Sequence, residues 1–113
     1  MIVRLPGQRP TRCRAVIHGD LVFAVAVAPE KVPSMYQQTR LALADADATL
    51  REAGTDKSRI LTAMVYVADM GQKDEMNRAW DEWADVANPP MRACVAVALA
   101  GASLVEIVLT AAK

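Results

Sequence analysis

The chain has 113 residues, with 13 basic and 13 acidic side chains that give a formal net charge of zero and a pI near 6.6. This length fits one domain, and a content of 53% hydrophobic and 23% charged residues is typical of a globular protein. The balanced charge excludes the basic footprint of a nucleic-acid binder, and no apolar run reaches the roughly 18 residues of a membrane span. We therefore expect neither a nucleic acid nor a membrane as a partner.

Two cysteines, Cys13 and Cys94, lie far apart and form no CxxC pair. This spacing argues against a zinc site and against a disulfide framework. No signal peptide opens the chain. We predict a cytoplasmic protein with free thiols and no metal.

The first half of the chain predicts two strands and a long helix. Residues 1–12 contain two prolines and a glycine, which indicate an irregular N-terminal arm or a short edge strand. Residues 14–18 and 21–27 read as strands, joined in a hairpin by the Gly19-Asp20 turn. Helical spacing of apolar residues then begins at Pro33, which suits a first helical turn, and ends at Gly54, which suits a left-handed cap.

The second half of the chain predicts a strand, a helix and two further strands. Residues 59–67 form an apolar strand, and a helix follows with Asp69 as N-cap and Gln72 reaching back to it. Met76, Trp80 and Trp83 make one apolar stripe of this helix, which we expect to pack on the sheet. Residues 90–97 and 103–111 read as the last two strands.

The element order β-β-α-β-α-β-β predicts an α+β domain over residues 1–113, with a mixed sheet and both helices packed on one face. The strands do not alternate with polar residues, so the other sheet face is also apolar. An apolar face must be covered, and we therefore expect an oligomer whose sheets pack together.

Each of the last two strands carries one charge inside an apolar run: Arg92 in the first and Glu106 in the second. Burying a lone charge costs several kcal/mol unless the charge is paired or bound to a ligand. From the residues alone, the two side chains are either a structural ion pair or parts of a site.

Three segments then show a resemblance: Asn77, the block Pro90-x-Arg92-Ala93-Cys94-Val95, and Val105-Glu106-Ile107. In these segments the chain resembles the reactive intermediate deaminase (Rid) family, also called YjgF-like or L-PSP endoribonuclease-like proteins, over roughly residues 14–112. The resemblance implies a chorismate-mutase-like fold and a homotrimer with clefts between subunits. It also implies hydrolysis of reactive enamines and imines to 2-keto acids and ammonia, without cofactor or metal.

The resemblance also assigns roles, which the chemistry makes reasonable. Arg92 would bind the carboxylate of an imino acid bidentately, and Glu106 would orient or deprotonate the attacking water. The backbone carbonyl of Cys94 would hold water or the leaving nitrogen, and Asn77 would lie beside the cleft. We expect Arg92 and Glu106 to face one pocket, because a short turn joins their strands.

Two features depart from the family pattern. Val25-Ala26-Val27 stands where the best-known members carry a Ser-Gly-Gln-like segment, and Arg12 falls near the place of a tyrosine. The pocket therefore takes a more apolar imine, or binds a small carboxylate without turnover. Ribonuclease activity, which one family label suggests, is disfavoured by the neutral charge and the few aromatic residues.

Simpler interpretations stay open for several of these residues. Cys94 is more easily read as a small buried hydrophobe than as a nucleophile, and Asn77 as a brace for its helix. His18, the only histidine, lies beside the Gly19 turn and suits a turn or surface position better than a catalytic base.

Overall fold

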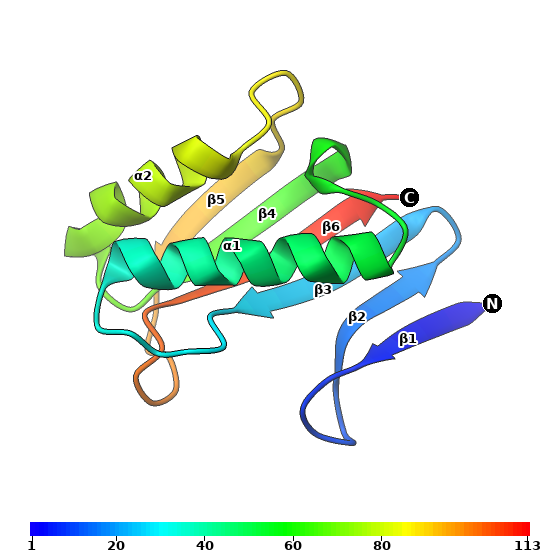
Figure 1. The fold of residues 1–113 in the computed structure, drawn as a ribbon, viewed down its shortest axis with the longest axis horizontal. Helices are drawn as coiled ribbons and strands as arrows, with labels where there is room; N and C mark the ends of the chain where they lie inside the picture. The colour runs from blue at the N-terminus through cyan, green and yellow to red at the C-terminus, as the bar shows by residue number, and fades with distance from the viewer.

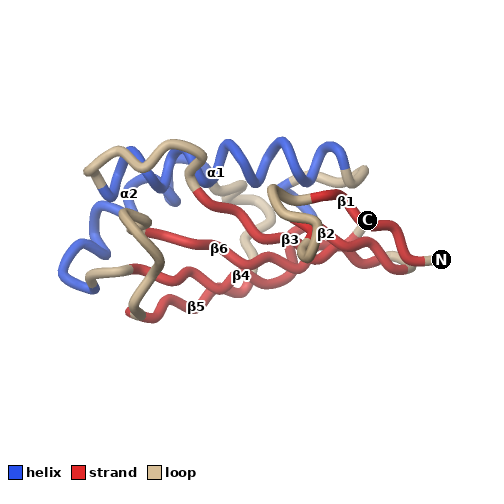
Figure 2. The backbone as a smooth tube through the Cα atoms, turned by 90° about the horizontal axis from the view of Figure 1, so that it is seen from below, coloured by secondary structure: helices blue, strands red, loops and turns tan.

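The computed structural model describes residues 1–113 as one mixed β-sheet with two α-helices on one of its faces (Figures 1 and 2). The six strands are β1 (Ile2–Pro6), β2 (Cys13–His18), β3 (Leu21–Val27), β4 (Ile60–Val67), β5 (Met91–Ala96) and β6 (Val105–Ala112). The helices are α1 (Met35–Glu52) and α2 (Lys73–Trp83), and two short 3-10 turns cover Lys57–Arg59 and Met70–Gln72. The predicted α+β class, with both helices on one face, is confirmed.

The strands lie in the order β1-β2-β3-β6-β4-β5. All pairs are antiparallel except β4 and β5, which run parallel and are connected through α2. A parallel pair needs such a crossover, because a tight hairpin turn reverses the chain. The last strand, β6, therefore enters the middle of the sheet between β3 and β4 and leaves β5 on an edge.

The N-terminal segment forms a regular strand and not an irregular arm. Residues 2–6 form β1, which pairs antiparallel with β2 from Ile2–His18 to Pro6–Cys13 and closes the other edge of the sheet. Of the two structures predicted for residues 1–12, the edge strand is the correct one. Pro6 lies at its end, where a missing N–H costs nothing in the ladder.

The hairpin between β2 and β3 has the predicted turn, with Gly19 at a φ of 59°. A side chain disfavours this left-handed conformation, and glycine adopts it freely. Pairing runs from His18–Leu21 to Ala15–Ala24 and then stops, although β2 begins two residues earlier and β3 continues to Val27. Beyond this point β2 follows β1, while β3 follows β6 to the pair Val27–Glu106.

Helix α1 begins at Met35, two residues after Pro33. Ser34 is the N-cap, and its hydroxyl accepts a hydrogen bond from the Gln37 N–H at 3.2 Å. The prediction that Pro33 occupies the first turn is wrong, because a serine can satisfy a free helix N–H and a proline cannot. The predicted end is confirmed: Gly54 has a φ of 87°, and Thr55 N–H reaches back to the Leu50 carbonyl at 2.9 Å.

The start of α2 also differs from the prediction. Asp69 does act as a cap, but of the short 3-10 turn, where its carboxylate accepts from Gly71 N–H at 2.9 Å. Gln72 does not reach back to it, and its Oε1 atom is buried without a hydrogen-bond partner. The inserted 3-10 turn moves Gln72 to the N-cap of α2, so the two residues are not placed as a reciprocal capping box.

The core lies between the helices and the sheet and uses many small residues. Ala42 and Ala46 of α1 are fully buried, as are Val65 of β4 and Ile107 of β6. Small side chains let a helix approach the sheet closely, which explains the Ala-rich composition. Met76 and Trp80 of α2 are part of this core, which confirms the predicted packing stripe.

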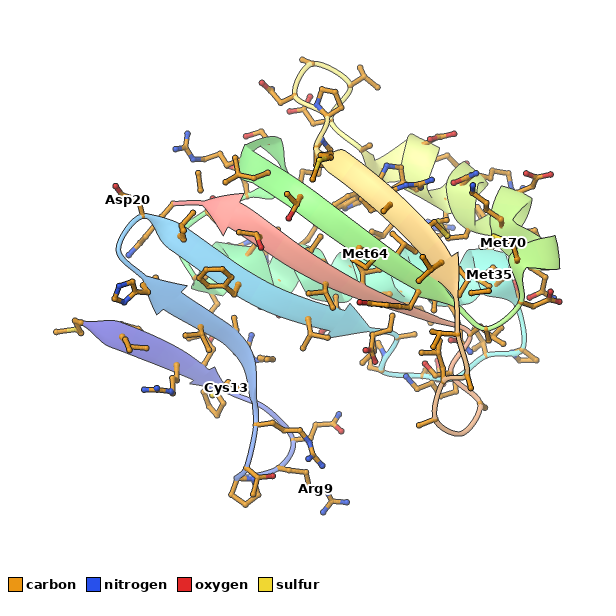
Figure 3. The ribbon with its side chains drawn as sticks, turned by 180° about the vertical axis from the view of Figure 1, so that it is seen from behind. Arg9, Cys13, Asp20, Met35, Met64 and Met70 are labelled. Atoms are coloured by element: carbon orange, nitrogen blue, oxygen red, sulfur yellow. The ribbon has the colours of Figure 1, made fainter.

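The opposite sheet face has no covering layer (Figure 3). Met64 of β4 lies in its middle, and large apolar side chains around it are exposed, among them Phe23 at 44% and Val108 at 40%. The strands thus present apolar residues to both sides, as the sequence predicted. Neither helix is long and apolar enough to cross a membrane.

Candidate functional site

Arg92 lies on the edge strand β5 with its side chain on the helix side of the sheet. Its Nη2 donates to Asn77 Oδ1 at 2.7 Å, and its guanidinium carbon lies 5.1 Å from the centre of the Trp80 ring. A longer contact of 3.6 Å joins Nη1 to the Met76 sulfur. All three neighbours come from α2 and none is a carboxylate, so the guanidinium is oriented but not neutralised.

Cys94 follows two residues later on the same strand and faces the same side as Arg92. Its side chain is half-buried against the core, and its thiol is free, as is that of Cys13. The N–H of Val97 bonds to β4, at the Val67 carbonyl. Because successive backbone groups of a strand point to alternate sides, the N–H and C=O of Cys94 point to the open edge.

Glu106 lies elsewhere. Strand β4 separates β5 from β6, and side chains in register alternate between the two faces of the sheet. Arg92 lies in register with Ala63 and Leu109, and the side chains of this row face the helices. Glu106 lies in register with Tyr66, and the side chains of this row face the opposite side of the sheet. The expectation that Arg92 and Glu106 face one pocket is wrong for a single chain, and so is a structural ion pair between them. The connection between β5 and β6 is short, but the two strands are not neighbours in the sheet.

Glu106 instead lines a cleft of about 620 Å³, which forms where β2 and β3 separate. Figure 3 shows the two strands diverging: Cys13 and Arg9 mark the part of the β1–β2 unit that leaves β3. The lining comes from four strands, from α1 and from the loops that follow β1 and β3. It comprises Pro6, Gly7, Gln8, Arg12, Cys13, Arg14, Val25, Val27, Pro29, Asp45 and Glu106.

The charged groups of this cleft differ in how they are paired. Arg14 forms an ion pair with Glu52 and also donates to Thr49 Oγ1 at 3.2 Å, so its charge is used in the fold. Asp45 accepts a long hydrogen bond of 3.4 Å from Val27 N–H. Arg12 and Glu106 form no ion pair. The cleft therefore offers one free cation, Arg12, and two carboxylates without an ion pair, Glu106 and Asp45.

A second cleft, of about 610 Å³, lies between α1 and α2, and its polar groups mostly satisfy one another. Trp83 Nε1 donates to the Asp47 carboxylate at 3.0 Å, and Tyr36 donates to Glu82 at 2.5 Å. The hydrogen bond to Glu82 is the main reason why the pKa of Tyr36 lies above its ordinary value of 10.0, with desolvation second. The polar side chains of this groove thus hold α1 and α2 together and leave few groups free for a ligand.

No group of three or more His, Cys, Asp or Glu side chains is arranged to hold a metal ion. His18, at the β2–β3 turn, is exposed and lines none of the four main clefts. Asn77, which the resemblance associated with the site, does lie against Arg92. The geometry thus places the two predicted site residues apart: an oriented Arg92 on an open edge, and Glu106 in a separate cleft.

A mixed sheet with two helices on one face is the chorismate-mutase-like arrangement, and comparison with known proteins agrees. The model of the family described as endoribonuclease L-PSP matches residues 12–113. A RutC family protein of Haemophilus ducreyi is 46% identical over 99 residues, covering 87% of this chain and 85% of that protein. The RutC family protein YoaB of Escherichia coli is 35% identical over 98 residues, covering 86% of each.

Among solved structures, a member of the YjgF protein family from Neisseria meningitidis has a TM-score of 0.94 and 37% identity, covering 100% of this chain and 95% of the other. The chain belongs to this YjgF/RutC/L-PSP family, and the predicted resemblance is confirmed.

Sequence reasoning missed most of the cleft around Glu106. Asp45 was assigned to no site, and Arg12 was noted only because it falls near a family tyrosine. The opening exists because two paired strands diverge, and the only local signal was the Pro6-Gly7 break that follows β1.

Proposed function

We propose that this protein is a hydrolytic deaminase of reactive enamine and imine intermediates, which releases 2-keto acids and ammonia. We further propose that it acts as a homotrimer, in which the Arg92 edge of one copy closes the Glu106 cleft of the next. The observation that carries the proposal is the state of Arg92. Its guanidinium is oriented by Asn77 and Trp80, has no counter-ion, and lies on an open sheet edge.

The chemistry follows from the residue types. An imino acid needs a fixed cation for its carboxylate, and the planar guanidinium of Arg92 can bind both oxygens at once. Water must then add to the carbon of the C=N bond. Glu106 is the carboxylate that would orient this water, and it has no competing ion pair. The unpaired backbone carbonyl of Cys94 can hold the water or the leaving nitrogen.

Two further observations support the assembly and its place in the cell. The uncovered sheet face is apolar and continuous across β3, β6 and β4, which favours burial against other copies. The two cysteines are free thiols, which suit a reducing compartment such as the cytoplasm. The proposed reaction uses only protein groups and water, so it requires no metal or cofactor.

The test uses the purified protein and imino acids generated in place by an amino-acid oxidase. The loss of trappable imine is followed with wild-type protein, with Glu106→Gln and without protein. We expect wild-type protein to speed the loss, and the variant to remove most of the acceleration. No acceleration with either small or bulky imines would refute the deaminase.

A non-catalytic carboxylate-binding protein of the same fold is the second candidate. Val25 and Val27 favour it, because they leave the cleft wall without a hydroxyl that can position water. In that case 2-keto acids would bind and stabilise the protein, while every imine would decay at its uncatalysed rate.

A further inference from the structure

The cleft around Glu106 contains a second cation that the proposed reaction does not use. Arg12 lines the cleft, and its only side-chain hydrogen bond is a long one of 3.5 Å to the hydroxyl of its neighbour Thr11. The other arginine of the cleft, Arg14, is bound to Glu52. Arg12 is therefore the one guanidinium of this cleft that is free to bind an anion.

The sheet order fixes what lies between Arg12 and Glu106. Arg12 immediately precedes β2, Glu106 is on β6, and β3 lies between these two strands. Val25 and Val27 of β3 line the same cleft, and Val27 is paired directly with Glu106. A ligand that spans the cleft thus meets a carboxylate, an apolar wall and a guanidinium in that order.

We propose that Arg12 selects substrates with a second carboxylate, so that the preferred substrates are imines of acidic amino acids. This inference rests on the proposed deaminase and specifies its substrate class. The reacting C=N carbon lies near Glu106, the side-chain methylenes cover Val25 and Val27, and the distal carboxylate binds Arg12.

The reaction itself stays a simple hydrolysis. Water adds to the C=N carbon, the C–N bond breaks, and the products are a 2-oxo dicarboxylate and ammonia. Arg12 takes no part in these bond changes and acts only on the distal group.

The same arrangement disfavours neutral substrates. A carboxylate on Arg12 forms charge-assisted hydrogen bonds in place of those to water. An amide or a methyl group in the same place displaces water from the guanidinium and supplies weaker partners or none. Sites built to bind a polar group discriminate strongly against analogues that lack it. We therefore expect selectivity against neutral imines as well as affinity for acidic ones.

The test compares imines generated by oxidases from glutamate and from glutamine, whose distal groups are a carboxylate and a neutral amide of nearly the same shape. For wild-type protein we expect kcat/KM to be about 10-fold higher for the glutamate imine, the effect of one charged hydrogen-bonded pair. Arg12→Gln should remove this preference, and Arg12→Lys should retain part of it. Arg9→Gln, on the same loop but outside the cleft, is the control and should retain all of it.

Two results would overturn the inference while leaving the deaminase intact: no preference in the wild-type protein, or an equal loss on both imines in Arg12→Gln. The equal loss would mean that Arg12 binds a group common to both substrates. If no imine is hydrolysed, binding of 2-oxoglutarate and 2-oxohexanoate is compared by calorimetry. Tighter binding of the dicarboxylate that depends on Arg12 would support the second-carboxylate site without the deaminase, and equal binding would reject it.

Discussion

Arg92 is oriented by neutral groups alone: an amide oxygen, an aromatic ring and a thioether, all from α2. Such partners fix the direction of a guanidinium without cancelling its charge. A carboxylate partner would instead compete with an anionic ligand. The surroundings of Arg92 therefore resemble a prepared anion site more closely than a structural ion pair.

The first prediction at this scale concerns the geometry of Arg92. Arg92→Lys keeps the charge but loses the planar pair of donors, and should lower kcat/KM about 10-fold, whereas Arg92→Ala should lower it about 100-fold. Steady-state kinetics on one imine measures both. Arg4→Ala, an exposed arginine of β1, is the control and should match the wild type. Equal activity of the lysine and arginine forms would contradict bidentate binding.

Tyr36 supplies a pH-dependent prediction. Its hydrogen bond to Glu82 stabilises the neutral phenol and raises its pKa above 10.0, against the lowering effect of Arg40 and Arg78. This contribution to stability is present below pH 10 and is lost as the pH rises through the raised pKa. Ultraviolet titration of Glu82→Gln should show one of the two tyrosines ionising at lower pH than in the wild type. An unchanged titration curve would show that the contact is absent in solution.

At the scale of elements, Gln38 connects α1 to the segment that leads into β6. The side chain is fully buried, and its amide nitrogen donates to the carbonyls of Val32 and Ala102, each at 2.9 Å. Its oxygen accepts from Leu104 N–H at 2.9 Å. One side chain thereby satisfies three backbone groups, two of them in the turn just before Glu106.

Replacing this side chain should loosen the turn and destabilise the fold. Gln38→Leu has a similar size but leaves the three backbone groups without partners, so we expect a loss of about 2–4 kcal/mol in the free energy of unfolding. Urea denaturation measures the change. Gln37→Leu, at an exposed position one residue earlier, should change it by less than about 0.5 kcal/mol. A similar small effect for both variants would mean that the Gln38 network contributes little.

The elements themselves were largely predictable, because periodicity and caps are local signals. The Gly19 turn and the Gly54 cap were found correctly, since only glycine suits their positive φ values. The placement of Glu106 was not predictable in the same way. Alternation around Val105 and Ile107 shows that Glu106 faces away from them, but strand order decides which cleft it enters. Strand order depends on long-range pairing, which a single sequence does not encode locally.

At the scale of the whole molecule, the chain buries one sheet face under its helices and leaves the other open. The strands of the open face have the apolar composition of buried strands, yet Phe23 and Val108 are exposed on it. A large apolar patch on a small protein is typical of an interface. Arg92 and Glu106 lie apart in one chain, which fits the proposal that they meet across a subunit boundary.

We expect this face to hold the assembly together. Phe23→Glu places a charge on this apolar face and should shift the protein from trimer towards monomer in analytical ultracentrifugation. Val86→Glu introduces the same charge at an apolar position that is 86% exposed on the loop before β5, and should leave the trimer unchanged. A wild-type protein that sediments as a monomer at micromolar concentration would remove the basis for the assembly.

The most direct test of the central claim is complementation between two inactive variants. Arg92→Ala and Glu106→Gln are co-expressed with different tags, and the mixed trimers are isolated by purification on both tags. If each cleft takes Glu106 from one copy and Arg92 from the next, a cyclic trimer that contains both variants has one cleft in which both residues are intact, about a third of the wild-type number. We predict recovery of about that share of the deaminase activity. Mixed trimers that remain as inactive as the separate variants would show that Arg92 and Glu106 do not act together across a subunit boundary.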